Sequence, residues 1–248
     1  MIFTHIYPLL HMATTVLHTA SSRGHQNHGW LIANHSFSFA NWYDPTRVHF
    51  GMLRVLNDDI IGAGRGFGMH PHDNMEIITI PLKGSLQHKD SMGFSEVVSR
   101  GEIQVMSAGT GVFHSEWNPS PTEDAHTLQT WVFPNKKNVE PRYQQLSFNP
   151  EDRKNKIQQI VSPNPEDEGA WIHQDAWYSW CELDAETKVD YSIKREGNGV
   201  YVFVIEGSVK ILETELNERD ALGISETESF TISANTKCFV LLIDVPMR

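Results

Sequence analysis

Two pairs of residues in this 248-residue chain have the types and the spacing of metal ligands. The stretch "GFGMHPHDNME" carries His70 and His72 with one residue between them, and "GTGVFHSEWN" carries His114 and Glu116 at the same spacing. In a β-strand, residues i and i+2 point to the same face about 6.6 Å apart, so each pair can converge on one ion. Pro71 is compatible with the start or edge of a strand, where its missing N–H breaks no ladder bond.

Together the two pairs offer three imidazole nitrogens and one carboxylate oxygen. This set suits a divalent first-row transition metal and leaves coordination positions open for water, substrate or O2, whereas structural zinc sites are more often closed by cysteines. Either pair alone is a weak signal in a chain with 13 histidines. The two pairs together predict one metal ion per chain. Iron, manganese, cobalt, nickel, copper and zinc all accept such ligands, so the residues do not choose among them.

The segments that must position these side chains are short and strand-like. Helical periodicity is almost absent, and apolar or alternating runs recur between Gly, Asn and Asp residues, at 52–56, 75–90, 102–109, 127–134, 188–194, 199–212 and 229–245. Many short strands separated by turn signals are typical of an all-β sandwich or barrel. The best candidate for a helix is the short stretch 150–156.

A weak internal repeat divides the chain into two similar halves. "MEIITIPLKGSLQHKD" resembles "GVYVFVIEGSVKILET", and in both an apolar strand ends at a glycine, Gly84 or Gly207, before a second strand begins. The repeat predicts two copies of one β-barrel unit. The expected division is an N-terminal extension (1–11, with Met12 as the alternative start), a metal-binding barrel (12–147), a polar linker (148–169) and a metal-free barrel (170–248).

The composition excludes several classes of partner. A net charge of −11 argues against a nucleic-acid-binding surface, and the basic runs at 135–137 and 152–156 are short and flanked by acids. No run approaches the roughly 18 apolar residues of a membrane-spanning helix. The first eleven residues lack the positive segment and cleavage site of a signal peptide.

The cysteine content indicates the compartment. Cys181 and Cys238 are the only cysteines of the chain. They cannot form a CxxC zinc site, and two cysteines in a chain of this size are not typical of a secreted disulfide scaffold. We therefore expect reduced thiols and a cytoplasmic location.

The motifs around the predicted ligands resemble those of a known family. "G(x5)HPH(x3)E" at 64–76 and "G(x5)SAGTGVFHSEWN" at 101–118 resemble the two cupin motifs. The wider set is similar to a bacterial pirin of the quercetin 2,3-dioxygenase type, over nearly all of the chain after Met12; it comprises "HSFSFANWYDP", "LRVLNDD", "HPH", "HKDSMG", "QVMSAGTGVFHSE" and "IHQDA". The resemblance implies a bicupin of two tandem jelly-roll-like β-barrels with few short helices. It also implies a metal held by the residues matching His70, His72, His114 and Glu116.

The resemblance implies two alternative functions. The first is a metal-dependent dioxygenase that cleaves a flavonol such as quercetin with O2, opening the ring with loss of CO. The second is a regulatory protein without enzymatic activity, whose metal responds to redox state and which binds a protein partner. For either function we expect a monomer with iron(II), although manganese, nickel, cobalt, copper or zinc could take its place.

The source of the carboxylate ligand stays open between two residues. In many other cupins it comes from the first motif, at the position of Glu76, and strand parity would point Glu76 the same way as His72. The pirin resemblance favours Glu116. Glu76 and Glu116 are both candidates for the group that takes the substrate's proton, and a structural, hydrogen-bonded carboxylate is the alternative for Glu76.

Several other residues are expected to have structural roles. The second half has no matching HxH or HxE pair and carries Arg219 where the family usually has Gly, so its barrel is predicted to be metal-free, with a relaxed turn, and to close one side of the pocket. An apolar collar and an aromatic packing group are also expected. His25, His28 and His35 could form a second metal cluster, but they lack a shared period and are expected on the surface or in turns. His88 and His126 are expected to be hydrogen-bonded structural residues. The collar, for which core packing is the alternative, is Phe67, Met69 and Phe113; the packing group is Trp171, Trp177, Tyr178 and Trp180.

Overall fold

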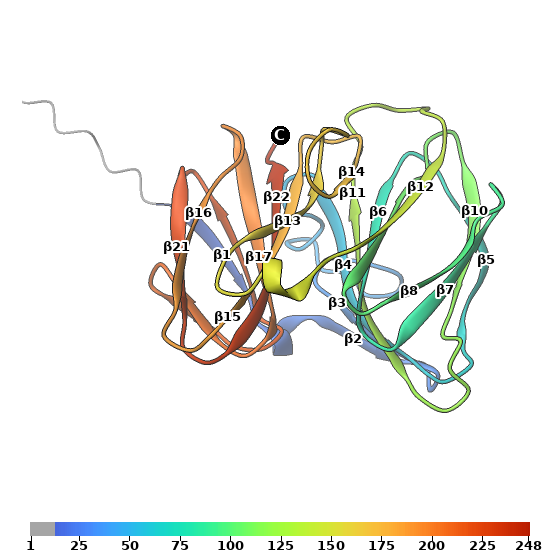
Figure 1. Ribbon diagram of the computed structural model, residues 1–248, viewed down its shortest axis with the longest axis horizontal. Coiled ribbons are helices and arrows are strands. Elements are labelled where there is room, and N and C mark those ends of the chain that lie inside the picture. The colour runs from blue at the N-terminus through green and yellow to red at the C-terminus, as the bar shows by residue number, and fades with distance from the viewer. Residues whose placement is uncertain (1–12) are drawn as a thin grey trace, which may run out of the picture.

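The computed structural model describes residues 13–248, and nearly all of its regular structure is β-strand (Figure 1). The extension expected at 1–11 lies outside the described residues. The helices are two short 3-10 turns, η1 (Ala20–Ser22) and η2 (Pro150–Asp152), and the second begins where a short helix is expected. No helix in the described part of the chain has the length and apolarity needed to cross a membrane.

The first barrel consists of a seven-stranded and a four-stranded antiparallel sheet. The strand orders are β12-β9-β6-β11-β4-β3-β2 and β5-β10-β7-β8. The strands of the larger sheet are β2 (Gly24–Asn27), β3 (Leu31–His35), β4 (Leu53–Ile61), β6 (Glu76–Lys83), β9 (Glu102–Ser107), β11 (Ala125–Val132) and β12 (Arg142–Ser147). Those of the smaller sheet are β5 (Gly66–His72), β7 (Ser85–Asp90), β8 (Ser95–Ser99) and β10 (Val112–Trp117).

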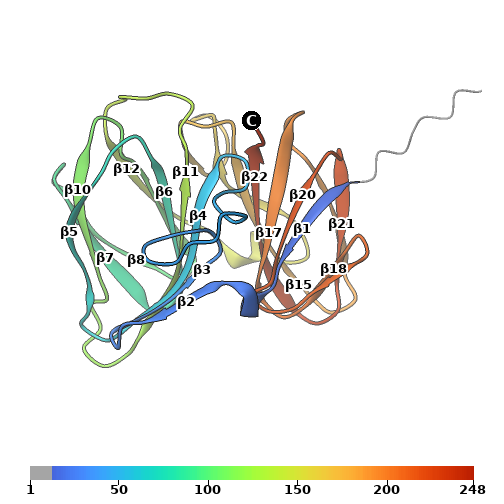
Figure 2. The same ribbon diagram turned by 180° about the vertical axis from the view of Figure 1, so that it is seen from behind.

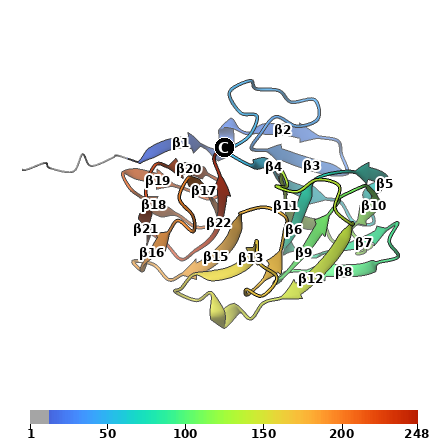
Figure 3. The ribbon, with the colours of Figure 1, turned by 90° about the horizontal axis from the view of Figure 1, so that it is seen from above.

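The second barrel repeats this plan and stands beside the first, as the views from the side and from above show (Figures 1 and 3). Its strand orders are β1-β20-β17-β22-β15-β13-β14 and β16-β21-β18-β19. The strands of the larger sheet are β1 (Thr14–His18), β13 (Gln158–Ser162), β14 (Ala170–Trp171), β15 (Trp177–Leu183), β17 (Asn198–Glu206), β20 (Ala221–Ser225) and β22 (Cys238–Pro246). Those of the smaller sheet are β16 (Lys188–Ser192), β18 (Val209–Ile211), β19 (Thr214–Leu216) and β21 (Ser229–Ala234). The prediction of an all-β chain with two tandem barrels is confirmed.

Two segments lie elsewhere than the expected division places them. Strand β1, from the first half of the chain, pairs with β20 and forms an edge of the second barrel's sheet (Figure 2). Strand β13, within the expected linker 148–169, pairs with β15 of the same sheet. Both strands are short, and their sequences do not specify the sheet that they join. The exact domain boundaries stay a prediction.

The two barrels share a hydrophobic core between their seven-stranded sheets. Leu53 and Leu128 of the first barrel belong to the same buried cluster as Trp180 and Leu241 of the second. Tyr178, also within this cluster, lies with its hydroxyl 3.0 Å from the hydroxyl of Thr130. The packing role expected for Tyr178 and Trp180 agrees with this arrangement. Continuous burial across both sheets fixes the orientation of the first barrel's strands, which carry the predicted site.

A polar link also joins the barrels. Arg219, in the turn before β20, keeps a left-handed backbone (φ 68°), and its guanidinium reaches Oδ1 of Asp58 at 3.3 Å. Arg23 and His126 contact the same carboxylate at 3.0 and 2.6 Å. The interpretation of this turn as relaxed is therefore wrong. Arg219 keeps the left-handed backbone that usually favours glycine, and its side chain forms an ion pair between the barrels.

The shared core predicts cooperative unfolding of the two barrels. Leu241 packs in the shared core, whereas Leu242 packs in the core of the second barrel alone. We expect Leu241→Ala and Leu242→Ala each to lower the free energy of unfolding by about 2–5 kcal/mol, because each leaves a cavity. Each variant and the wild type should melt in one transition, followed by calorimetry. Two well-separated transitions in the wild type would contradict a shared core.

Candidate metal centre

Three imidazoles converge where β5 pairs with β10. His70 and His72 extend from β5, and His114 lies directly opposite His70 on β10. The three ring centroids are 4.4–4.9 Å apart, and each ring offers a nitrogen within 4.8 Å of the others. The strands approach closely because residue 66 is glycine: a Cβ there would lie 2.2 Å from the carbonyl oxygen of Glu116. The i, i+2 spacing on β5 thus brings its two histidines together as expected.

Burial keeps two of these imidazoles neutral. It lowers the pKa of His114 to about 3, with the neighbouring charges of His70 and His88 acting in the same direction. It lowers the pKa of His72 to about 4, again assisted by the other two histidines. At neutral pH both rings therefore present a lone pair, the form that binds a metal ion.

Hydrogen bonds select which nitrogen of each ring is left for an ion. Asp90 Oδ2 can only accept, so His88 Nε2–H donates to it at 2.9 Å. His88 Nδ1 lies 3.5 Å from His114 Nδ1, and we assign their shared proton to His114. His114 Nε2 then carries the lone pair, and it is buried without a hydrogen-bond partner among residues 13–248. In the same way His70 Nδ1–H donates to the carbonyl of Gly68 at 2.8 Å, so His70 Nε2 carries the lone pair that could bind an ion.

The carboxylate of Glu116 is buried beside this cluster and is held by two donors. Gln129 Nε2 donates to Oε2 at 2.8 Å, and the hydroxyl of Thr79 donates to Oε1 at 3.3 Å. Trp131 Nε1–H donates to Gln129 Oε1 at 3.0 Å, which fixes the direction of the amide. Glu116 also forms a second close group of possible ligands with His88 and His114. Three imidazoles and this carboxylate fit a divalent transition metal.

Glu76 lies apart from the cluster. Its carboxylate accepts from the Ser107 hydroxyl at 2.6 Å, and it is neither in a group of possible ligands nor in the lining of the cavity described below. The parity argument that aligned it with His72 fails because the chain turns at Asn74 (φ 43°) and enters the opposite sheet of the barrel. Burial raises the pKa of Glu76 to about 7, against the hydrogen bond from Ser107.

His88 has a closer relation to the predicted ligands than its sequence pattern indicates. It is hydrogen-bonded, as expected for a structural residue, but its ring also contacts that of His114. A signal was available in "HKD": His88 and Asp90 have the same i, i+2 spacing as the predicted ligands. A carboxylate that orients a histidine in this way is a common support for metal-binding imidazoles.

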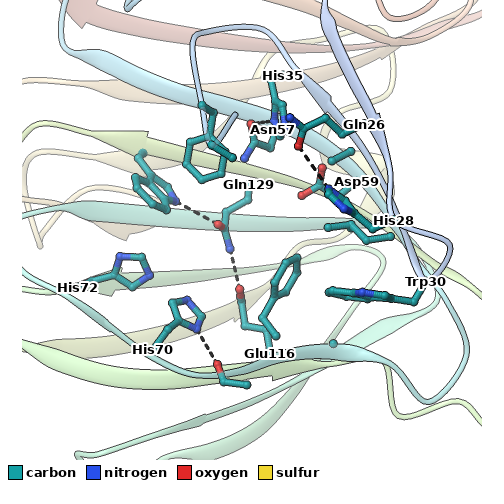
Figure 4. Close-up of a pocket in the computed structure, with 18 residues that line it drawn as sticks. Gln26, His28, Trp30, His35, Asn57, Asp59, His70, His72, Glu116 and Gln129 are labelled. Atoms are coloured by element: carbon teal, nitrogen blue, oxygen red, sulfur yellow. Dashed lines mark hydrogen bonds between the residues drawn. The ribbon is translucent and has the colours of Figure 1, made fainter. Parts of the chain in front are cut away.

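A cavity of about 480 Å³ opens beside His70, His72 and Glu116 (Figure 4). Its aromatic walls are Trp30, Phe39, Phe67 and Trp131, and the whole lining comes from residues 26–131. The expectation that the second barrel closes one side of the pocket is therefore wrong. The apolar collar is also only partly present. Phe67 lines the cavity, whereas Met69 and Phe113 are 59% and 53% exposed. Met69 and Phe113 alternate with the inward-facing His70 and His114, and the extra residue that β5 carries opposite β10, between Phe67 and His70, reverses the side to which Phe67 points.

The remaining histidines have separate partners. His25 contacts Asn34 at 2.9 Å, His28 contacts Gln26 at 3.3 Å and His35 contacts Asn57 at 2.8 Å. The three form no second metal cluster within the described residues. His28 and His35 nevertheless line the cavity, which their irregular spacing in the sequence did not indicate.

The hydrogen bonds to Glu116 predict a metal-affinity effect. Gln129→Leu removes the stronger donor and frees the carboxylate to rotate, so we expect metal affinity to fall about 10–100-fold. Gln87→Leu is the matched control, because Gln87 precedes His88 on β7 and points to the outer face. Competition with a metal-sensitive dye measures both. Equal affinities for the two variants would show that Gln129 does not position the ligand.

The burial of Glu76 predicts a pH effect on stability. Since its pKa rises from 4.5 to about 7 on folding, the wild type loses stability as pH rises through this window. Glu76→Gln has no carboxylate to ionise, so its stability relative to the wild type should increase from pH 4 to pH 8, by up to a few kcal/mol. Urea unfolding at both pH values tests this, with the exposed Glu123→Gln as control. A pH-independent difference would mean that the carboxylate ionises freely.

Comparisons with known proteins agree with this architecture. The family model described as Pirin matches residues 16–132, and the one described as Quercetinase C-terminal cupin domain matches residues 159–245. The Quercetin 2,3-dioxygenase of Escherichia coli (strain K12) is 45% identical over 231 residues, which are 93% of this chain and 98% of that protein. The Pirin-like protein of Caulobacter vibrioides is 36% identical over 222 residues, 89% and 95% of the two chains.

A solved structure supports the same family assignment. The crystal structure of the bacterial pirin YhhW from Escherichia coli in complex with nickel(II) has a TM-score of 0.89 at 42% identity, and the match covers 94% of this chain and 99% of that chain. The expectation of an enzyme resembling quercetin 2,3-dioxygenases agrees with the names of these relatives. The chain belongs to the pirin family, and its two barrels form a bicupin.

Proposed function

We propose that this protein is a metal-dependent dioxygenase that cleaves flavonols such as quercetin with O2. The observation that carries the proposal is that His70, His72 and His114 form one close group of possible ligands, which the buried Glu116 adjoins through His114, beside an aromatic-lined cavity of about 480 Å³. Cavities of this size suit small aromatic ligands. The relative named Quercetin 2,3-dioxygenase supports the reaction, and the nickel(II) complex of the Escherichia coli pirin supports a divalent metal.

In this proposal His70, His72, His114 and Glu116 hold the ion, for which we propose iron(II). A bound divalent metal supplies Lewis acidity toward the substrate's oxygens and a template that keeps the flavonol near O2. His88 and Asp90 orient His114 so that Nε2 faces the ion.

The chain's own groups perform the remaining steps. Glu116 accepts the proton of the flavonol 3-hydroxyl, and the donors on Gln129 and Thr79 keep its carboxylate in position. Glu76 does not line the cavity, and we propose a structural role for it. Trp131 and Phe39 contact the flat rings and exclude water while the ring is opened with loss of CO.

One observation favours the regulatory alternative. Met69, Phe113 and Trp117 expose apolar side chains on the outer face of β5 and β10, where Trp117 is 41% exposed. A protein partner could bury such a surface. The cavity that adjoins the histidines favours the enzyme, because binding a protein on the outer face does not require an aromatic-lined cavity beside the predicted ligands.

The test combines metal analysis with flavonol consumption. Wild type, His72→Ala and Glu116→Ala are compared for metal content and for loss of quercetin in air and under nitrogen. We expect about one metal per wild-type chain and O2-dependent quercetin loss, with both properties reduced at least tenfold in the variants. His25→Ala, an exposed histidine outside the cluster, is the control and should behave as wild type. Stoichiometric metal without quercetin loss would contradict the dioxygenase and favour the partner-binding alternative.

A further inference from the structure

A row of polar side chains crosses the sheet that lines the cavity. The register of the antiparallel strands places His35 of β3 opposite Asn57 of β4, Asn57 opposite Gln129 of β11, and Gln129 opposite Thr79 of β6. Gln129 and Thr79 are the two donors to Glu116. The row therefore leads from the predicted metal ligand to a second polar region, which Figure 4 shows at the far side of Gln129 from His70 and His72.

We call this region, Asp59 with His35, the far pole. Asp59 and His35 are only 7% and 3% exposed, and both line the cavity. Asp59 Oδ1 and His35 Nε2 are buried atoms without a hydrogen-bond partner in residues 13–248. Leaving a buried polar atom unpaired costs free energy, and native proteins rarely do so without a reason. Two such atoms in one cavity indicate a ligand that satisfies them.

The hydrogen-bonding character of the far pole follows from its neighbours. His35 Nδ1 lies 2.8 Å from Asn57 Oδ1, which can only accept, so Nδ1 carries the proton and Nε2 is an acceptor. Burial, with the charges of Asp58 and Glu116 acting in the same direction, raises the pKa of Asp59 to about 8. At neutral pH the Asp59 carboxyl can therefore donate. A hydroxyl group complements this pair, because it donates one hydrogen bond and accepts others.

The distance across the sheet sets the size of the ligand. Neighbouring strands lie about 4.8 Å apart, so His35 on β3 is about 10 Å from Gln129, two strands away. The same cavity has aromatic walls, formed by Trp30, Phe39, Phe67 and Trp131. A ligand that spans the cavity is thus flat and aromatic, with oxygens for a metal at one end and a hydroxyl at the other.

We propose that Asp59 and His35 form a subsite that binds a phenolic hydroxyl on the part of the substrate farthest from the metal. The position of this hydroxyl within a flavonol rests on the proposed function. Recognition of the hydroxyl does not, because it requires neither O2 nor ring opening. Asp59 and His35 would determine which hydroxylated aromatic compounds enter in the productive orientation.

The experiment uses 2-naphthol and naphthalene, which share one aromatic skeleton and cannot chelate a metal. Isothermal titration calorimetry on the nickel-loaded full chain compares their affinities for wild type, Asp59→Leu and His35→Phe. We expect wild type to prefer 2-naphthol about ten- to hundredfold, and each variant to lose most of this preference. His25→Phe is the matched control, since His25 is exposed and outside the cavity lining, and it should keep the preference.

Each outcome of this experiment either supports the proposed subsite or overturns it. Equal affinities of the two compounds for wild type would overturn it, even if a variant failed to fold. An undiminished preference in folded Asp59→Leu and His35→Phe would also overturn it, because the hydroxyl would then bind elsewhere, such as on the nickel. A preference lost in both variants supports the subsite, whether or not the protein consumes flavonols in the separate assay with O2. Failure of the subsite and failure of the dioxygenase are therefore distinguishable.

Discussion

The constraint on which the rest of the structure depends is the burial of His114 with one nitrogen unpaired. Its ring is fully buried, its Nδ1 is occupied by His88, and its Nε2 has no partner within the described chain. A folded protein tolerates such an atom where a ligand completes it. The neighbouring features serve this position: Gly66 lets β5 approach, and the histidines of β5 converge on the same point.

Because alternate residues of a strand face opposite sides, the seven-stranded sheet of the first barrel lines the cavity with one face and packs against the second barrel with the other. On β4, Asn57 and Asp59 face the cavity, whereas Leu56 packs in the core shared with the second barrel and Asp58 pairs with Arg219. The second barrel thus packs behind the sheet that carries the site and supplies no residue to the cavity lining. Small displacements of a ligand or proton acceptor reduce catalysis strongly, so a large apolar support behind the sheet is a functional component.

The sequence predicts well what depends on neighbouring residues. The convergence of His70 with His72 follows from local alternation, and the two barrels follow from strand patterns and the internal repeat. Prediction fails where the chain changes sheet. Strand parity does not hold between His72 and Glu76 because a turn separates them, and β1 joins the second barrel although its own sequence contains no sign of this.

The two residues of the far pole illustrate the same limit of prediction from the sequence. His35 and Asp59 meet in the cavity only through the register of β3 with β4, and that register is set by the whole sheet rather than by either segment. His28 and His35 share no period in the sequence, so the sequence alone does not group them. Their place in the cavity lining requires the structure.

The most direct test of the account is the position of the ion in crystals of the metal-loaded protein, located by anomalous scattering. The account predicts one ion per chain, with nitrogens of His70, His72 and His114 and an oxygen of Glu116 about 2.0–2.2 Å away. The competing arrangement is available in the same structure, since His88 forms a close group with His114 and Glu116. An ion bound by His88 in place of the β5 histidines, or one held by Glu76, would contradict the account.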